Sequence, residues 1–229
     1  MSTDVRVDGN SSGKIVSIGD RPPVVYVVDD ERFVRSYLSR LLTSSGYEVT
    51  AFASADEVLE NDLGPGPGCV LLDLCLPGVG GLELQRILAD KAGHLPIIFV
   101  SGRGTVPLSV EAMKNGALDF LTKPLDTQKL LPAIARAMER SATLCTERVA
   151  GAALEERVRT LSPRQAEVIR LVATGLLNKQ IATELQILEK TVKVHRARAM
   201  RKLGVKSVAE LVRLADRTTF SGRPPAASR

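Results

Sequence analysis

Residues 24–31 read VVYVVDDE, an uninterrupted apolar run followed directly by acidic side chains. A run of Val and Tyr without polar breaks fits a strand that is covered on both faces, as in a parallel sheet. Further short apolar runs follow, with amphipathic segments between them, at residues 47–52, 69–74, 96–100 and 118–121. This alternation of strand and helix patterns predicts an α/β doubly wound domain with a five-stranded parallel sheet over residues 23–142.

The run at residues 47–52, YEVTAF, alternates apolar and polar side chains, unlike the other runs. Such alternation indicates a strand with one face open to solvent, which suits the edge of a sheet. The strand order 2-1-3-4-5, known for doubly wound sheets, has the second strand at an edge and makes the first, third, fourth and fifth strands near neighbours, and we expect that order here.

The strand pattern stops after residue 121, and the rest of the chain is helical in character. We predict a helical linker at residues 143–160 and an all-α helix-turn-helix domain at residues 161–217. Residues 1–22 and 218–229 have no such periodicity, and we expect flexible tails there.

Composition argues against a membrane protein and against a disulfide framework. No apolar run among the 229 residues approaches the roughly 18 residues needed to cross a bilayer. The three cysteines have neither zinc-site spacing nor a paired arrangement. We therefore expect a cytoplasmic protein.

Charge is divided unevenly along the chain. Residues 1–150 hold 15 Lys and Arg and 19 Asp and Glu, a net charge of −4. Residues 151–229 hold 16 Lys and Arg and 7 Asp and Glu, a net charge of +9. A compact basic unit commonly faces phosphates, although a merely solvated basic surface has the same composition.

Polar side chains follow the predicted strands where each strand ends. Asp29 and Asp30 follow the first strand, and Asp73 follows the buried run of the third. Ser101 follows the fourth strand, and Lys123 follows the fifth. Because ligands of such sheets bind at the carboxyl ends of the strands, we expect these carboxylates, the hydroxyl and the ammonium to converge.

The converging carboxylates need a cation, because they repel one another, and oxygen ligands with open positions for water suit Mg²⁺. A carboxylate beside Mg²⁺ and an ammonium can attack a phosphoryl group, since that transfer depends on positioning and charge neutralisation. Asp73 lies at the middle strand and is the best candidate acceptor. Ser101 would donate a hydrogen bond to the phosphoryl group, and Lys123 would form an ion pair with it.

Residues 24–125 resemble the receiver domain of bacterial two-component response regulators. The motifs that carry the resemblance are VVYVVDDE (24–31), LLDLCLPGVGGLEL (71–84) and PIIFVSGRGTVPLSVEAMKNGALDFLTKP (96–124). The resemblance implies that Asp73 accepts phosphate from a sensor histidine kinase and that Ser101 and Phe120 form the switch pair of the family. It also implies the following Mg²⁺ ligands: Asp30, Asp73, the backbone carbonyl of Cys75 and, through water, Asp29.

Residues 178–203 fit a helix-turn-helix, with a short helix at 178–184, a turn at 185–188 and a longer helix at 189–203. One stripe of the longer helix, formed by Val192, His195, Ala199 and Leu203, can face a core. The opposite face is expected to enter the major groove of double-stranded DNA, and it consists of Lys190, Lys193, Val194, Ala197 and Arg201. Four further side chains are expected to contact backbone phosphates: Lys179, Arg196, Arg198 and Lys202.

Residues 161–205 also resemble the LuxR/FixJ-type DNA-binding domain, through NKQIA at 178–182 and TVKVH at 191–195. The resemblance implies that Lys193 and Val194 touch bases and that the last helix, residues 208–215, helps to pair two subunits. Leu188 departs from the family, which usually has Ser or Thr there to cap the recognition helix. Losing such a cap costs roughly 0.5–2 kcal/mol.

Together the two resemblances imply a transcription regulator, not an enzyme, that is switched by phosphorylation. Phosphate on Asp73 is expected to draw Ser101 inward, so that Phe120 follows and the surface of the next helix shifts. Two receivers then form a homodimer, and two recognition helices read half-sites about 10 base pairs apart. We expect transcription activation, with RNA polymerase as a further partner.

Other functions are compatible with parts of this pattern. An enzyme of the haloacid-dehalogenase type also uses an Asp at a strand end, but it needs a second Asp where this chain has Cys75. A ligand-sensing or constitutive helix-turn-helix regulator with a degenerate receiver would leave the acidic residues idle. A protein-interaction module would not bind DNA in a salt-dependent manner.

Overall fold

The computed structural model describes residues 23–102 and 104–216, and the tails predicted at 1–22 and 218–229 lie outside the described residues. The chain divides into two compact units between Thr146 and Glu147. Within the described ranges, no helix is both long enough and apolar enough to cross a bilayer.

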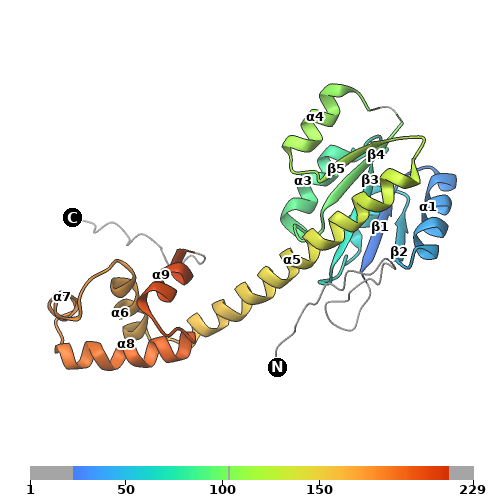
Figure 1. Ribbon diagram of the computed structural model, residues 1–229. Helices are drawn as coiled ribbons and strands as arrows, with labels where there is room; N and C mark the ends of the chain where they lie inside the picture. Colours follow the sequence, from blue (N-terminus) through green and yellow to red (C-terminus); the bar gives the residue numbers. More distant parts are fainter. Residues whose placement is uncertain (1–22, 103, 217–229) are drawn as a thin grey trace. The chain divides into compact units, whose positions relative to one another are not determined.

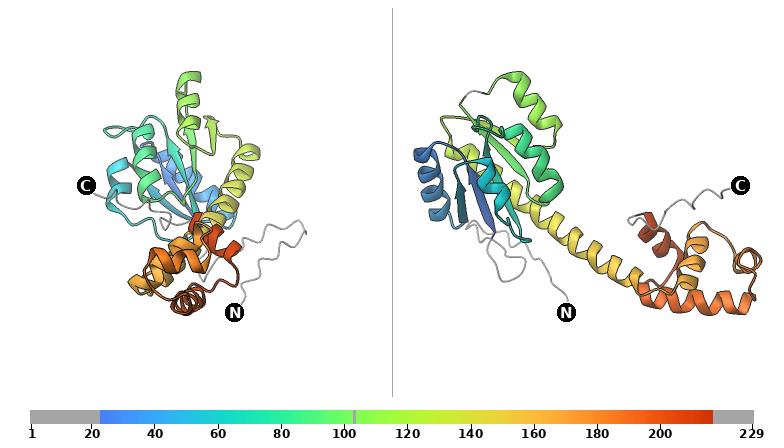
Figure 2. Two further views of the ribbon diagram at one scale, coloured as in Figure 1. Left: turned by 90° about the vertical axis from the view of Figure 1, so that its left-hand side faces the viewer. Right: turned by 180° about the vertical axis from the view of Figure 1, so that it is seen from behind.

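The first unit is a five-stranded parallel sheet with helices on both of its faces (Figures 1 and 2). Strands and helices alternate along the chain in the order β1 (Val24–Val28), α1 (Arg32–Ser44), β2 (Glu48–Phe52), α2 (Ala55–Glu60), β3 (Gly68–Asp73), α3 (Gly81–Lys91), β4 (Ile97–Ser101), α4 (Val106–Lys114), β5 (Asp119–Thr122) and α5 (Thr127–Arg159). The strand order is β2-β1-β3-β4-β5, with β2 at one edge. The predicted doubly wound fold and its strand order are therefore confirmed.

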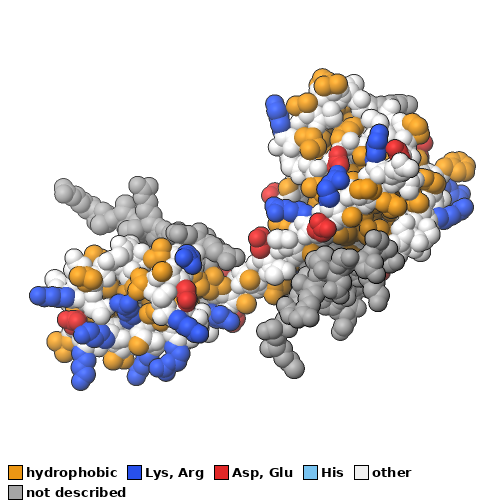
Figure 3. Space-filling view, viewed as in Figure 1, with side chains coloured by type: hydrophobic (Ala, Val, Ile, Leu, Met, Phe, Trp, Pro, Cys, Tyr) orange, Lys and Arg blue, Asp and Glu red, His pale blue; other side chains and the backbone are white. Residues whose placement is uncertain are grey.

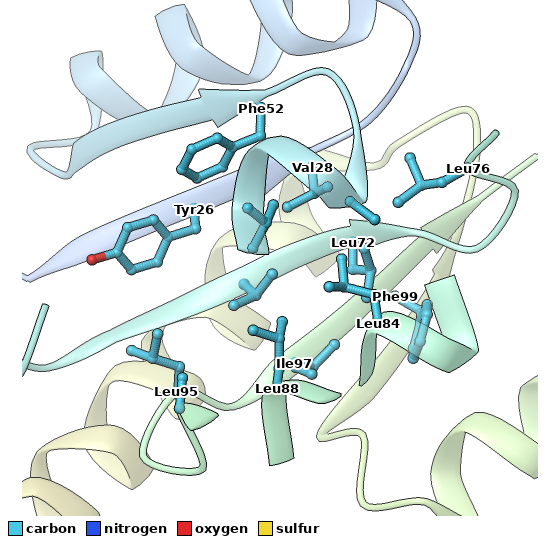
Figure 4. Packing of buried hydrophobic residues seen from close by; sticks show 14 of the residues in the cluster. Tyr26, Val28, Phe52, Leu72, Leu76, Leu84, Leu88, Leu95, Ile97 and Phe99 are labelled. Carbon is cyan, nitrogen blue, oxygen red and sulfur yellow. The ribbon is translucent and has the colours of Figure 1, made fainter. Parts of the chain in front are cut away.

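Successive side chains of each strand point to opposite faces of the sheet. Helices cover both faces, so both sets of side chains are buried. Val70 and Leu72 of β3 pack with residues of α2, α3 and α4 in one apolar cluster (Figure 4). Cys69 and Leu71 of the same strand pack with residues of α1 and α5 in the other cluster. Burying each of these larger side chains contributes roughly 2 kcal/mol. Asp73 is the last residue of β3 and follows the apolar residues of that strand directly.

Helix α5 continues through most of the segment that we predicted as a helical linker, residues 143–160, and ends at Arg159. Its middle part is tied to the first unit by buried polar contacts. The hydroxyl of Ser141 accepts from the Gly68 N–H at 3.0 Å and donates to the His94 carbonyl at 2.7 Å, and Cys145 is also buried. The helix therefore belongs to the first unit at least as far as Cys145.

The second unit is all-α, and its core is formed by apolar residues of four helices. The helices are α6 (Pro163–Ala173), α7 (Asn178–Glu184), α8 (Glu189–Leu203) and α9 (Val208–Asp216). The α7–α8 pair has the bounds predicted for the helix-turn-helix. Val192, Ala199 and Leu203 of the predicted core stripe are buried, whereas His195 is only half-buried. Gly204 ends α8 with a φ of 74°, in the left-handed region that glycine adopts without a steric penalty.

Candidate functional site

The ammonium of Lys123 is the centre of the acidic site at the carboxyl ends of the strands. Its Nζ lies 2.8 Å from Asp29 Oδ2, 2.8 Å from Asp73 Oδ2 and 3.1 Å from Glu31 Oε1. The side chains of Lys123, Asp29 and Asp73 are only 15%, 3% and 6% exposed, so water screens their attraction little. The residues follow or end β1, β3 and β5, and the parallel topology brings them together.

Both oxygens of the Asp73 carboxylate have hydrogen-bond donors. Oδ2 accepts from Lys123 Nζ at 2.8 Å, and Oδ1 accepts from the backbone N–H of Cys75 at 3.0 Å. These two bonds fix the orientation of the carboxylate at the end of β3. The side chain of Cys75 is exposed beside it, with a free thiol.

The buried charges shift one another's pKa values. Burial raises the pKa of the Asp29 carboxyl above its usual range, and hydrogen bonds from Lys123 and the Glu31 N–H offset part of that rise. Burial by itself would lower the pKa of the Lys123 ammonium, but the hydrogen bonds to Asp29, Asp73 and Glu31 outweigh burial and raise it. Lys123 is therefore charged at neutral pH, and the Asp29 carboxylate is in a setting that favours an added cation.

The donor set suits a hard divalent cation. Asp29, Asp30 and Asp73 each offer a carboxylate oxygen, and these oxygens lie within 4.8 Å of one another. Asp30 is exposed and opens the cluster to solvent, whereas the other two are buried. Carboxylate oxygens with room for water are the environment that Mg²⁺ favours in proteins.

The predicted switch residues lie on the neighbouring strands. Ser101 is the last residue of β4 and is fully buried, and its carbonyl accepts from the Lys123 N–H at 2.9 Å. The ring of Phe120 stacks on Phe99, with centroids 6.1 Å apart. The ring also lies close to Gly104, where an added Cβ would be 2.6 Å from Phe120 Cζ. The lack of a side chain at position 104 is therefore what admits the ring in this position.

Two residues of the acidic site were assigned no role from the sequence. Glu31 completes the carboxylate shell of Lys123, and its place directly after Asp29 and Asp30 is the signal for it. Arg35 binds the backbone of the same segment from α1. Nothing in the sequence pattern distinguishes Arg35 from other basic residues of an amphipathic helix.

The predicted DNA-contacting residues form a basic surface on α8, with Lys179 on α7. All of them are exposed except Arg196, which is half-buried. Val194, the apolar member of this surface, is 40% exposed. Lys and Arg side chains gather along this part of the second unit, as Figure 3 shows.

Three of these basic side chains have partners within the protein. Lys193 pairs with Glu189 at 2.9 Å, one turn earlier in α8. Arg196 donates to Asn178 Oδ1 at 3.1 Å and thereby links α8 to α7. Lys202 donates to the Thr160 carbonyl at 2.6 Å, at the C-terminal end of α8. DNA contact by each of them stays a prediction.

The N-terminus of α8 has no side-chain cap. Leu188 occupies the N-cap position, makes no capping hydrogen bond and is 76% exposed. Glu189 is the acidic residue of the first turn, where its negative charge interacts favourably with the helix dipole and stabilises the helix. The capping departure expected from the sequence is therefore present in the structure.

Comparisons with known proteins match both units. Residues 25–135 match the response regulator receiver domain, and residues 159–215 match the bacterial regulatory proteins of the luxR family. Nodulation protein W of Bradyrhizobium diazoefficiens is 44% identical over 193 residues, which cover 84% of this chain and 85% of that protein. The response regulator protein TodT of Pseudomonas putida is 41% identical over 200 residues, 87% of this chain and 88% of that protein.

Two solved structures of similar length also match. The response regulator StyR is 43% identical, with a TM-score of 0.70, over 86% of this chain and 99% of that chain. Full-length FixJ from B. japonicum is 39% identical, with a TM-score of 0.52, over 85% of this chain and 96% of that chain.

Proposed function

Because this chain belongs to the family of two-component response regulators with a LuxR-type DNA-binding domain, we propose that Asp73 is its phosphoacceptor and a sensor histidine kinase its phosphodonor. The chain is a two-component DNA-binding transcription regulator. The observation that carries the proposal is the pair of hydrogen bonds to Asp73, from the Cys75 N–H and from the ammonium of Lys123, whose side chain is largely buried.

The residues of the site supply positioning and charge neutralisation. An oxygen of Asp73 attacks the phosphorus, and the bond from phosphorus to the donor breaks as the new P–O bond forms. Lys123 neutralises charge on the transferred group and is already in place. The proposed Mg²⁺ ligands are Asp30, Asp73, the carbonyl of Cys75 and, through water, Asp29. When bound there, Mg²⁺ would neutralise phosphoryl oxygens.

We propose that the phosphoryl group acts through the neighbouring strands. Ser101, at the end of β4, would move toward the phosphoryl group, and Phe120 would follow into the space that it leaves. The surface of α4 would then change and favour a homodimer of receivers. This is a local charge event that biases a two-state element.

The basic surface of α8 is proposed to bind double-stranded DNA. Its exposed cations would set the register on the phosphates, and Lys193 and Val194 would reach base edges in the major groove. Dimerisation would place two such helices on half-sites about one helical turn apart. We propose RNA polymerase as the further partner on the promoter.

The test is Asp73→Asn in the full-length chain, incubated with acetyl phosphate and Mg²⁺. Wild-type protein is expected to gain the mass of one phosphoryl group, to dimerise and to bind DNA more tightly, whereas the variant gains none of these. Asp90→Asn, which changes an exposed carboxylate at the end of α3, serves as the matched control. An adduct that persists in the Asp73 variant would overturn the assignment of Asp73.

Two further outcomes correspond to the alternative functions. DNA binding of wild-type protein that is tight and indifferent to the phosphodonor would indicate a constitutive regulator with a degenerate receiver. Binding that responds to a small molecule, without any phosphoryl adduct, would indicate a ligand sensor.

A further inference from the structure

Arg35 of α1 contacts the backbone of three successive residues that carry acidic side chains. Its guanidinium Nη1 donates to the carbonyl of Asp29 at 2.7 Å and to the carbonyl of Asp30 at 2.8 Å. Its backbone N–H donates to the carbonyl of Glu31 at 3.1 Å, which is the first turn of α1. The third bond is an ordinary backbone bond of a helix, whereas the first two come from the side chain, which thus binds the Asp29–Asp30 part of the β1–α1 turn.

We infer that Arg35 is a positioning residue that sets the β1–α1 turn so that the carboxylates of Asp29 and Asp30 face Asp73 and can bind a divalent cation. The inference rests on the proposed function, because it assumes that this cluster holds Mg²⁺. It assigns to Arg35 a role through the backbone, without contact to the cation or to the phosphoryl group.

The contacts of Arg35 argue for this role over a purely electrostatic one. The guanidinium binds carbonyl oxygens, whereas the carboxylate of Asp29 is paired with Lys123 and with the Glu31 N–H. The turn precedes α1, so the carbonyls of Asp29 and Asp30 lie before the first backbone bond of the helix. Both bonds come from the one nitrogen Nη1, which the planar guanidinium presents in a fixed direction, whereas the ammonium of lysine ends a flexible stem that holds no such direction.

The two roles predict opposite changes in Mg²⁺ affinity when the Arg35 side chain is removed. If Arg35 acted only as a charge, its removal would strengthen Mg²⁺ binding, because a positive group near the site repels the metal. If Arg35 positions the turn, its removal weakens Mg²⁺ binding, because the ligands lose their preset geometry. Loss of residues that orient metal ligands typically costs 10–100-fold in metal affinity, so we expect about tenfold.

The experiment measures Mg²⁺ affinity of the full-length chain by isothermal titration calorimetry in the wild type, Arg35→Gln and Arg35→Lys. Arg32→Gln is the matched control, since Arg32 is an exposed residue of the same helix turn and loses the same charge. We expect about tenfold weaker binding in both Arg35 variants and unchanged or slightly tighter binding in Arg32→Gln. Tighter or unchanged binding in Arg35→Gln, or wild-type affinity in Arg35→Lys, would overturn the inference.

A second measurement needs no metal and separates this inference from the proposed function. Amide hydrogen exchange at residues 29–31 is expected to be faster in Arg35→Gln than in the wild type and Arg32→Gln, with Mg²⁺ absent throughout. Unchanged exchange there contradicts a positioning role. If wild-type protein fails to bind Mg²⁺ but the exchange difference is present, the metal assignment fails and the role of Arg35 in the turn stands.

Discussion

The acidic site of the first unit and the basic surface of the second are charged sites built in opposite ways. Lys123 and Asp73 lie 50 positions apart in the sequence and meet only because β3 and β5 belong to one parallel sheet. The basic surface comes almost entirely from one helix, α8, whose residues are neighbours in the sequence. Two acidic groups, Asp29 and Asp73, are buried and share the ammonium of Lys123, whereas most of the basic groups are exposed and separate.

This difference predicts how each site responds to the loss of one member. In the acidic site the charges of Lys123, Asp29 and Asp73 are largely buried and paired, so removing one of them changes the electrostatic energy of the other two. On α8 the cations are screened by solvent and interact weakly, so their contributions to DNA binding should add. The comparison can be tested by single substitutions in each site.

The largest effect is expected from Lys123→Met, which leaves two buried carboxylates without their counter-ion. We expect a loss of about 3 kcal/mol in the free energy of unfolding at neutral pH without Mg²⁺, measured by urea denaturation. Mg²⁺ should restore part of this loss. The matched control is Lys129→Met. The Lys129 side chain is 75% exposed and its Nζ lies 4.0 Å from Asp126 Oδ2, so this change should alter stability by less than about 0.5 kcal/mol.

The pH dependence of wild-type stability tests the same ion pairs of Lys123. The pKa of Lys123 is raised in the folded protein, from an ordinary value of 10.5. The stability that it contributes is therefore fully present below pH 10.5 and is lost as the pH rises through the folded-state pKa. A Lys123 variant as stable as the wild type in Mg²⁺-free buffer would contradict the contrast between the two sites.

An intermediate effect is expected from Lys190→Gln and Arg201→Gln on the outer face of α8. Each should lower the slope of log affinity against log salt by about 0.9, and the double variant by the sum, because each cation releases about one counterion from DNA. Fluorescence anisotropy with labelled duplex at several salt concentrations measures the slope. Arg170→Gln, an exposed change of the same charge on α6, serves as the control. Strongly non-additive slopes would show that the basic surface is as coupled as the acidic site.

The smallest effect is expected from Glu189→Gln, which frees Lys193 from its ion pair within α8. Such helix pairs contribute roughly 0.3–0.5 kcal/mol, so DNA affinity should rise about twofold. Glu184→Gln, an exposed glutamate at the end of α7, is the comparison variant. Weaker DNA binding in Glu189→Gln would mean that the dipole interaction of Glu189 matters more than the release of Lys193.

The helix-turn-helix could be predicted from sequence nearly to the residue. The bounds of α7 and α8 follow from local periodicity, and Gly204 marks the end of α8. The lack of a side-chain cap at Leu188 also followed from the sequence. The helical linker expected at residues 143–160 likewise continues α5 as far as Arg159. The sequence did not show that buried Ser141 and Cys145 hold the middle of that helix against the first unit.

The acidic site could be predicted only in outline. Asp29, Asp73 and Lys123 stand at strand ends, so the strand order places them at one edge. The sequence did not reveal that one ammonium would hold three carboxylates, nor that Gly104 would adjoin the ring of Phe120. These contacts join residues from different parts of the chain, and they depend on how the strands and helices pack.

The sequence by itself determined the elements, their order and the sign of charge in each unit, because apolar periodicity and strand-end residues are local properties of the chain. Only the tertiary structure decided which charged side chains are buried together and which backbone carbonyls a charged side chain binds. The role of Arg35 is the clearest case, since its significance comes from two carbonyl oxygens at 2.7 and 2.8 Å and not from its place in a motif. Burial removes the screening by water, and it thereby converts proximity into strong and specific coupling.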